Sequence, residues 1–168
     1  QRLLVNGASG GVGVYATQLG RCFGADVTAV TSFRNVHWME RLGAHETVDY
    51  TQHDFTELKA KYDVIFDCFG NRSFFQVQSV LDTRGIYIST IPALRPFASV
   101  VSTWFRKKRS AVVLVRPNGK NLAEIGRLLE QQEVYSIVDR VYERTAIKEA
   151  YLHLETKRAK GKIVVRMR

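Results

Sequence analysis

The chain has 168 residues, of which 45% are hydrophobic and 24% charged, and its formal net charge is +9. This length and composition are ordinary for one soluble globular domain, and they exclude a membrane span and a recognisable signal peptide. We therefore expect a soluble, intracellular protein, cytoplasmic or mitochondrial. The chain opens at Gln1, without a Met, and enters a predicted strand almost at once, so we also expect it to be part of a longer protein.

The cysteines and the positive charge narrow the classes of function. Cys22 and Cys68 lie far apart in the sequence, within predicted apolar elements, which argues against a disulfide framework or a zinc cluster. The net charge of +9 favours an anionic partner. A nucleic acid is less favoured than a phosphorylated cofactor, because the basic run Arg106–Arg109 lacks the interleaved aromatic residues of an RNA-stacking sheet.

A glycine-rich motif lies near the N-terminus, between a predicted strand and a predicted helix. The predicted strand Leu3–Asn6, with the apolar run Leu3-Leu4-Val5, is followed by Gly-Ala-Ser-Gly-Gly-Val-Gly at residues 7–13. The helix carries apolar side chains at helical spacing on one face: Val12, Ala16, Leu19 and Phe23. Glycines at 10 and 13 permit a tight turn and a close packing of helix on strand, and the helix N-terminus offers free N–H groups to phosphates. The motif predicts a dinucleotide phosphate site.

Strands and helices alternate after this loop. Four more strands are predicted, at Asp26–Thr31, Thr47–Tyr50, Tyr62–Phe69 and Ile86–Ile91. Short helices are predicted between them, at Asn35–Leu42, Phe55–Ala60 and Arg72–Leu81. Because parallel strands need crossover connections, this order predicts an α/β fold, a Rossmann-type doubly wound parallel sheet in three layers.

Residues 92–115 admit several interpretations. Pro92 and Pro96 bracket a turn, and Phe97–Arg109 mixes apolar and basic side chains. This segment fits a packed helix with a basic end, a lid over the cofactor, or a surface for a partner or membrane. Ala111–Val115 then predicts an apolar strand near the sheet edge, which suggests either pairing with a second copy in a homodimer or burial beneath the last helix.

The remaining residues are predicted to form two helices and two strands. Asn121 with Glu124 three residues later is a capping arrangement, so we expect a helix to begin there. One face of this helix is predicted to be core: Leu122, Ile125, Leu128 and Leu129. The last predicted elements are a strand near Ser136–Val141, a helix around Ile147–Leu154 and a strand at Lys162–Val165.

The end of the second strand favours NADPH over NADH. An NAD enzyme usually carries Asp or Glu about 20 residues beyond the glycines, to hold the ribose hydroxyls. Ser32 and Arg34 take that place here, and a hydroxyl and a guanidinium suit the oxygens of a 2′-phosphate. The alternative is a helix-start serine beside a surface arginine. Tyr50 could close the adenosine side of the site or pack at the sheet edge.

Several segments together resemble one family. They are Val5–Gly13, Leu42–Ala44 with Val48–Tyr50, Tyr62–Gly70, and Gly161–Val165. In this order and spacing the chain resembles, over nearly its whole length, the medium-chain dehydrogenase/reductase superfamily in its zinc-independent, quinone oxidoreductase-like branch. The resemblance implies that residues 1–168 form an NADP-binding Rossmann domain that includes a C-terminal return segment at about 142–168.

The resemblance also implies a cofactor site. The implied residues are Ser9, Gly10, Gly11 and Val12 at the pyrophosphate, Ser32, Arg34 and Tyr50 at the 2′-phosphate and adenosine, and Phe69, Gly70, Asn71 and Thr90 at the ribose and nicotinamide. Family members also have an N-terminal β domain that forms one wall of the substrate cleft, and this sequence does not contain it. Zinc ligands, where family members have them, lie mostly in that domain, so we expect no metal site here.

A short-chain dehydrogenase is the main competing family, because Gly7, Gly11 and Gly13 also fit its glycine spacing. Its chemistry needs a tyrosine with a lysine four residues later, where the ammonium lowers the pKa of the phenol. None of the seven tyrosines has a lysine at that distance, which disfavours this family.

The resemblance implies an oxidoreductase that transfers hydride from NADPH to a quinone or to an α,β-unsaturated carbonyl or enoyl substrate, although this chain alone is expected to be inactive. No residue identifies the substrate or the catalytic acid. The histidines are all predicted to lie on solvated surfaces: His37, His45, His53 and His153. A second class of function stays open, a non-catalytic dinucleotide-binding module used for assembly or RNA binding.

Overall fold

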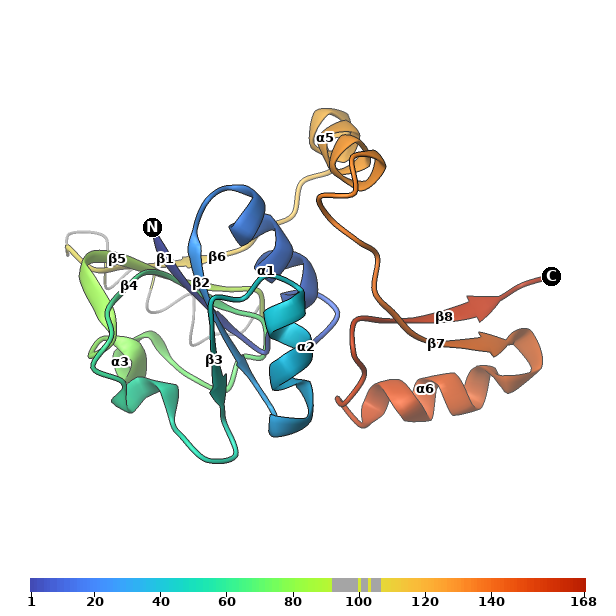
Figure 1. Ribbon diagram of the computed structural model, residues 1–168, viewed down its shortest axis with the longest axis horizontal. Coiled ribbons are helices and arrows are strands. Elements are labelled where there is room, and N and C mark those ends of the chain that lie inside the picture. The colour runs from blue at the N-terminus through green and yellow to red at the C-terminus, as the bar shows by residue number, and fades with distance from the viewer. Residues whose placement is uncertain (92–99, 101–102, 104–106) are drawn as a thin grey trace.

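The computed structural model describes residues 1–91, 100, 103 and 107–168. Pro92, Pro96 and most of Phe97–Arg109, for which the sequence leaves three interpretations, lie outside the described residues. Within the described part, the strands form a six-stranded sheet and a separate two-stranded sheet (Figure 1).

All neighbouring strands of the larger sheet are parallel. Its strands are β1 (Arg2–Asn6), β2 (Asp26–Thr31), β3 (Glu46–Asp49), β4 (Tyr62–Asp67), β5 (Leu81–Ser89) and β6 (Arg109–Val112), in the spatial order β3-β2-β1-β4-β5-β6. The elements between the strands are α1 (Gly13–Cys22), α2 (Val36–Arg41), α3 (Phe74–Val77) and 3-10 turns at Phe33–Asn35 and Phe55–Glu57. This topology confirms the predicted α/β, Rossmann-type sheet.

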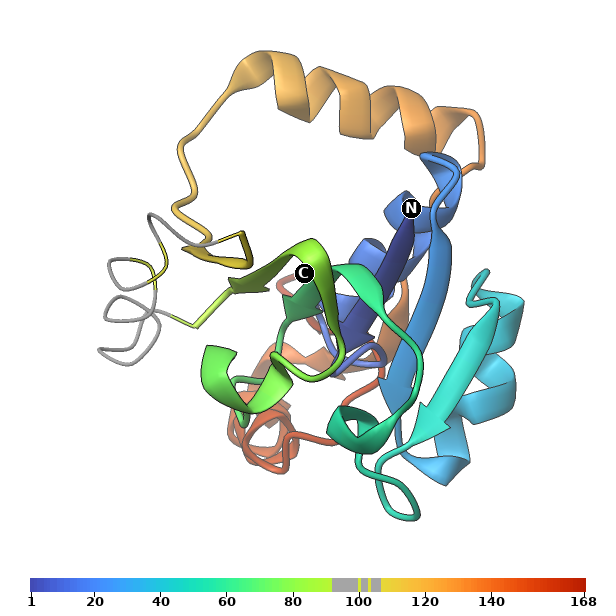
Figure 2. The ribbon, with the colours of Figure 1, turned by 90° about the vertical axis from the view of Figure 1, so that its left-hand side faces the viewer.

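Apolar side chains pack against both faces of the sheet. Successive residues of a strand point to opposite faces, so neighbours on one strand belong to different clusters. On β1, Leu4 belongs to one core cluster, with Phe74 and Val77 of α3, whereas the next residue, Val5, belongs to another, with Met39 of α2. Helices α1 and α2 lie on one side of the sheet and α3 on the other (Figure 2), which gives the three predicted layers.

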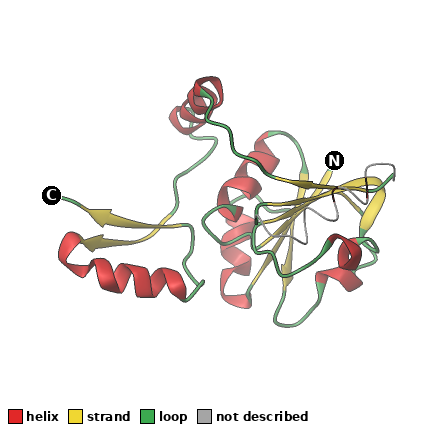
Figure 3. Cartoon of the chain, turned by 180° about the vertical axis from the view of Figure 1, so that it is seen from behind, coloured by secondary structure: helices red, strands yellow, loops and turns green. Residues whose placement is uncertain are grey.

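The C-terminal residues form a second, smaller α/β unit. Helix α5 (Gly119–Glu130) leads to β7 (Val138–Glu143), a 3-10 turn at Arg144–Ala146, α6 (Ile147–Glu155) and β8 (Lys162–Arg166). Strands β7 and β8 pair in parallel, and α6 connects them. Figure 3 shows this unit beside the large sheet rather than within it. The final strands therefore do not extend the six-stranded sheet.

The prediction that one face of α5 is core was wrong. Of the four residues on that face, only Leu128 is buried, whereas Leu122 is 70% exposed. The extended residues 113–118 carry the helix away from the sheet, and Leu128 shares a small apolar cavity with Tyr15 and Leu19 of α1. The predicted cap was also wrong, since the Asn118 side chain accepts the N-terminal hydrogen bond, from the amide of Lys120.

The two helices predicted after β3 and β4 are much shorter in the structure. The segment predicted at Phe55–Ala60 is a single 3-10 turn, Phe55–Glu57. Helix α3 begins only after Ser73, whose side chain and backbone form a capping box with Gln76. It ends before Leu81, which pairs with Tyr62 as the first residue of β5, so tertiary pairing ends this helix early.

The predicted edge strand at Ala111–Val115 begins and ends earlier, as β6 at Arg109–Val112. It is the last strand of the sheet, as expected of an edge. Leu114 is 67% and Val115 86% exposed, so these residues are not buried beneath the last helix. Pairing with a second copy stays a prediction.

Replacing Asp54 with Ala is expected to lower the free energy of unfolding by about 1 kcal/mol at neutral pH, because its carboxylate caps the 3-10 turn through the Thr56 amide and pairs with Arg72 at 2.6 Å. Desolvation alone would raise the pKa of Asp54, but these hydrogen bonds and the Arg72 charge lower it below the ordinary value. The stabilisation is therefore present at neutral pH and lost as the pH falls through that lowered pKa. Urea unfolding of both proteins, at neutral pH and at a pH below that lowered pKa, measures the difference in the free energy of unfolding.

Glu57→Ala is the matched control, since Glu57 is exposed on the same turn, and it should change the free energy of unfolding little at either pH. An Asp54→Ala loss that is the same in acid as at neutral pH would contradict the assignment to the ionised carboxylate.

Candidate functional site

The residues implied to bind a cofactor lie along the carboxyl edge of the six-stranded sheet. In spatial order, this edge carries Tyr50 after β3, Ser32 and Arg34 after β2, Ser9–Val12 after β1, Phe69–Asn71 after β4 and Thr90 after β5. Ligands of open parallel sheets bind at this edge, where the strand order reverses, here between β1 and β4. The structure thus places residues from five separate strand ends along one edge of the sheet.

The glycine loop depends on a very close approach between β1 and α1. Gly7 has a φ of +77°, and a Cβ added at Gly13 would lie 2.6 Å from the Cα of Ala8. Helix α1 therefore begins directly over the loop. Within the described residues, the amide N–H groups of Gly11 and Val12 have no hydrogen-bond acceptor, so the helix N-terminus presents them as an anion site.

The turn before β8 packs against this loop. The Gly161 amide donates to the Ser9 carbonyl oxygen at 3.1 Å. A Cβ added at Gly11 would lie 3.1 Å from both the Gly161 carbonyl oxygen and Lys162 Nζ. The absence of a side chain at Gly11 therefore allows the C-terminal turn to bring an ammonium group beside the free amides.

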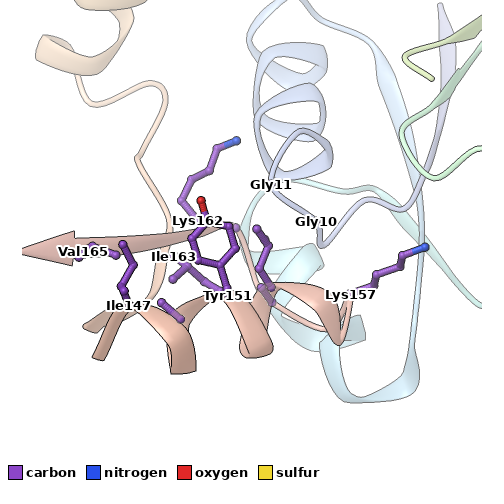
Figure 4. A pocket seen from close by; sticks show the side chains of 12 residues that line it. Gly10, Gly11, Ile147, Tyr151, Lys157, Lys162, Ile163 and Val165 are labelled. Atoms are coloured by element: carbon purple, nitrogen blue, oxygen red, sulfur yellow. The ribbon is translucent and has the colours of Figure 1, made fainter. Parts of the chain in front are cut away.

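An open cavity of about 500 Å³ separates the glycine loop from α6 and β8. Figure 4 shows the ammonium groups of Lys157 and Lys162 on either side of the Gly10–Gly11 turn, with the ring of Tyr151 on the Lys162 side. The sequence analysis missed all three of these side chains. One signal could have found the lysines, because four of the six residues from Lys157 to Lys162 are basic.

The ends of β2 and β3 bring together the residues implied to hold the 2′-phosphate. The Tyr50 amide donates to the Thr31 carbonyl oxygen at 3.0 Å, which places Tyr50 beside Ser32. Ser32 precedes the 3-10 turn, and its hydroxyl oxygen accepts from Asn35 Nδ2 at 3.4 Å. Tyr50 is 63% exposed and Arg34 is also exposed, with no ion-pair partner among the described residues. These groups are therefore available to a ligand.

Two further findings concern titratable side chains. His153 was predicted to be a solvated histidine, but its ring lies 3.2 Å from a carboxylate oxygen of Asp139 and 3.0 Å from the Tyr142 hydroxyl. It therefore joins α6 to β7. Cys22 and Cys68 are free thiols, and both are partly exposed. Burial, and less strongly the charge of Asp67, raises the pKa of the Cys68 thiol to about 12.

The comparisons with known proteins agree with this fold. A family model described as zinc-binding dehydrogenase matches residues 42–165. The chain belongs to the zinc-binding dehydrogenase family. Within it, the chain is a quinone oxidoreductase-like nucleotide-binding domain of the medium-chain dehydrogenase/reductase superfamily, which confirms the resemblance. Membership implies a nicotinamide dinucleotide as cofactor.

The chain spans about half the length of the relatives that it matches. A chloroplast envelope quinone oxidoreductase homolog of Arabidopsis thaliana is 31% identical over an alignment of 170 positions, which covers 97% of this chain and 51% of the relative. The trans-enoyl reductase poxH of Penicillium oxalicum is 30% identical over 191 residues, with coverages of 99% and 50%. The quinone oxidoreductase structure from Coxiella burnetii has a TM-score of 0.90 at 25% identity, with coverages of 99% and 53%.

Although the family description names zinc, the described part of this chain contains no set of zinc ligands. Nowhere in residues 1–91, 100, 103 and 107–168 do three or more His, Cys, Asp or Glu side chains come together as metal ligands. Burial also raises the pKa of both Cys22 and Cys68, whereas zinc binds the thiolate. These residues do not fit a zinc site, and we assign no chemical step to one. Among the described residues, no helix is long and apolar enough to cross a membrane.

Gly13→Ala is expected to lower the free energy of unfolding by about 3 kcal/mol, because the added methyl group would force α1 away from the Ala8 backbone. Gly126→Ala is the matched control, because a Cβ there meets nothing within 4 Å inside helix α5. This control should stabilise the chain by about 0.5–1 kcal/mol. Guanidinium unfolding measures both values, and similar effects of the two substitutions would contradict the close approach.

Proposed function

We propose that this chain is the NADPH-binding domain of an oxidoreductase that transfers hydride from NADPH to a quinone or an α,β-unsaturated carbonyl or enoyl substrate. The anion site at the N-terminus of α1 carries this proposal. The free amides of Gly11 and Val12 and the ammonium of Lys162 converge there, beside an open cavity. Amide donors and an ammonium match the charge and the oxygen acceptors of a pyrophosphate.

The preference for NADPH rests on the end of β2. Neither Ser32 nor Arg34 is acidic, so these two residues do not repel a 2′-phosphate as the carboxylate of an NAD site would. Arg34 is exposed and has no protein ion-pair partner among the described residues. Its guanidinium can therefore donate two parallel hydrogen bonds to phosphate oxygens, which Lys could not do.

The substrate class is supported by the relatives, whose names describe a quinone oxidoreductase homolog and a trans-enoyl reductase. When bound, the nicotinamide supplies the hydride. The residues of this chain bind and orient the cofactor, with the loops after β4 and β5 on the nicotinamide side of the strand-order reversal.

Arg34→Ala is expected to reduce the preference for NADPH over NADH about tenfold or more, because one charge-assisted contact to the 2′-phosphate is lost. Parallel titrations of the chain with NADPH and NADH, followed by nicotinamide fluorescence at fixed salt, measure the preference. Lys162→Ala should instead lower the affinities for NADPH and NADH about equally, because both cofactors carry the pyrophosphate.

Arg41→Ala is the matched control for the charge, since Arg41 is exposed in the last turn of α2, and it should leave the preference unchanged. Equal affinity of the unsubstituted chain for NADPH and NADH would overturn the roles of Ser32 and Arg34. Binding of neither cofactor would overturn the proposed function of this chain.

A further inference from the structure

A buried carboxylate lies directly beneath the nicotinamide side of the proposed site. Asp67, the last residue of β4, has no exposed surface, and no Lys, Arg or His pairs with it among the described residues. A buried carboxylate without a counter-ion is costly unless hydrogen-bond donors surround it. The arrangement of donors around Asp67 is therefore a strong constraint on the neighbouring chain.

The Asp67 side chain fixes the loop that follows it. One carboxylate oxygen accepts from the Phe69 amide at 3.0 Å and from the Gly70 amide at 2.8 Å. Gly70 has a φ of +79°, and a Cβ there would lie 2.7 Å from Ile91 Cγ1, so the loop also packs against the chain after β5. Phe69 and Gly70 are thus held by charge-assisted bonds, which are roughly twice as strong as neutral ones.

The same carboxylate oxygen also holds the Asn71 side chain in place, through a hydrogen-bonded bridge formed by Asn6. Asn6 Nδ2 donates to Asp67 at 2.9 Å and to the Asn71 side-chain oxygen at 2.8 Å. Asn6 is 4% exposed at the end of β1, so it cannot move freely. This bridge engages the oxygen of the Asn71 amide and leaves its NH₂ group without a partner in the described part of the chain. Asn71 is therefore oriented to donate to a ligand.

The other contacts of Asp67 reach β5. The Tyr87 hydroxyl donates to the second carboxylate oxygen at 2.6 Å, and burial, followed by this bond and the charge of Asp67, raises the pKa of Tyr87, so the phenol stays protonated. The Thr90 amide and hydroxyl both donate to the Asp67 carbonyl oxygen, at 3.0 and 3.2 Å. One residue thus connects the ends of β1, β4 and β5.

We propose that Asp67 is the positioning residue for the nicotinamide half of the dinucleotide site. This inference rests on the proposed function, because it assigns Phe69–Asn71 and Thr90 to that half of the cofactor. Asp67 itself is buried and touches no ligand. It holds the loop and the Asn71 amide in place before the cofactor arrives, so that binding does not have to order them.

The test compares two ligands that differ in the nicotinamide half. NADPH reaches the loops after β4 and β5, whereas adenosine 2′,5′-bisphosphate carries only the adenosine, its 2′-phosphate and one phosphate at the glycine loop. Asp67→Asn keeps the shape of the side chain, and its amide can still donate to the Tyr87 oxygen, so the chain should fold. We expect NADPH to bind about tenfold more weakly, and adenosine 2′,5′-bisphosphate to bind within about twofold of its original affinity.

The fluorescence lifetime of bound NADPH gives a second readout, since it reports how firmly the nicotinamide is held. It should shorten in Asp67→Asn. Asp63→Asn is the matched control, because Asp63 lies on the same strand but accepts from the Arg2 amide at the surface of the sheet. This control should change neither affinity nor lifetime.

Equal weakening of both ligands, or no weakening of NADPH, would overturn the positioning role while leaving the proposed function intact. Failure of the unsubstituted chain to bind either ligand would instead overturn the proposed function, and the inference with it. If Asp67→Asn does not melt cooperatively, Asn6→Ala decides alone, because it removes the bridge to Asn71 and leaves the other donors to Asp67 in place. Asn6→Ala should lower the affinity for NADPH about threefold and leave the affinity for adenosine 2′,5′-bisphosphate unchanged.

Discussion

The close packing of α1 against the end of β1 determines most of what this chain can do. Because Gly13 has no side chain, the helix begins within van der Waals distance of the Ala8 backbone and points its first amides into the space above the loop. Because Gly11 has none either, the turn at Gly161 can dock on the loop and bring Lys162 beside those amides. The free amides at the start of α1 and the contact between the two α/β units therefore both depend on glycine at positions 11 and 13, where a Cβ would meet neighbouring atoms.

Charged groups differ in sign and in burial between the two ends of the cofactor edge. At the glycine loop, helix amides and the lysines at 157 and 162 present positive charge for phosphates. At the ends of β4 and β5, by contrast, the buried negative charge of Asp67 is fully used inside the protein, where it holds backbone and amide groups in place. Under the proposed function, the exposed charges would bind the ligand, and the buried charge would order the residues that meet it.

Local signals predicted the large sheet, but they did not predict how the C-terminal half is assembled. The glycine motif and the strand–helix alternation of residues 1–91 were sufficient because the central strands β1 and β2 are mostly buried and the crossovers are short. The apolar face of α5 misled the prediction, since periodicity says that Leu122 and Ile125 share a face and not that anything covers it. Lys162 and Asp67 became visible only with the fold, because their partners are 151 and 61 residues away, at Gly11 and Asn6.

Amide chemical shifts measured during a titration with NADPH test the central claim most directly, that the N-terminus of α1 is the anion site. We predict that the largest changes in a ¹H–¹⁵N spectrum occur at Gly11 and Val12, whose amides have no acceptor among the described residues and would donate to the pyrophosphate. Saturable changes confined to the basic C-terminal residues, with the glycine loop unmoved, would contradict the account.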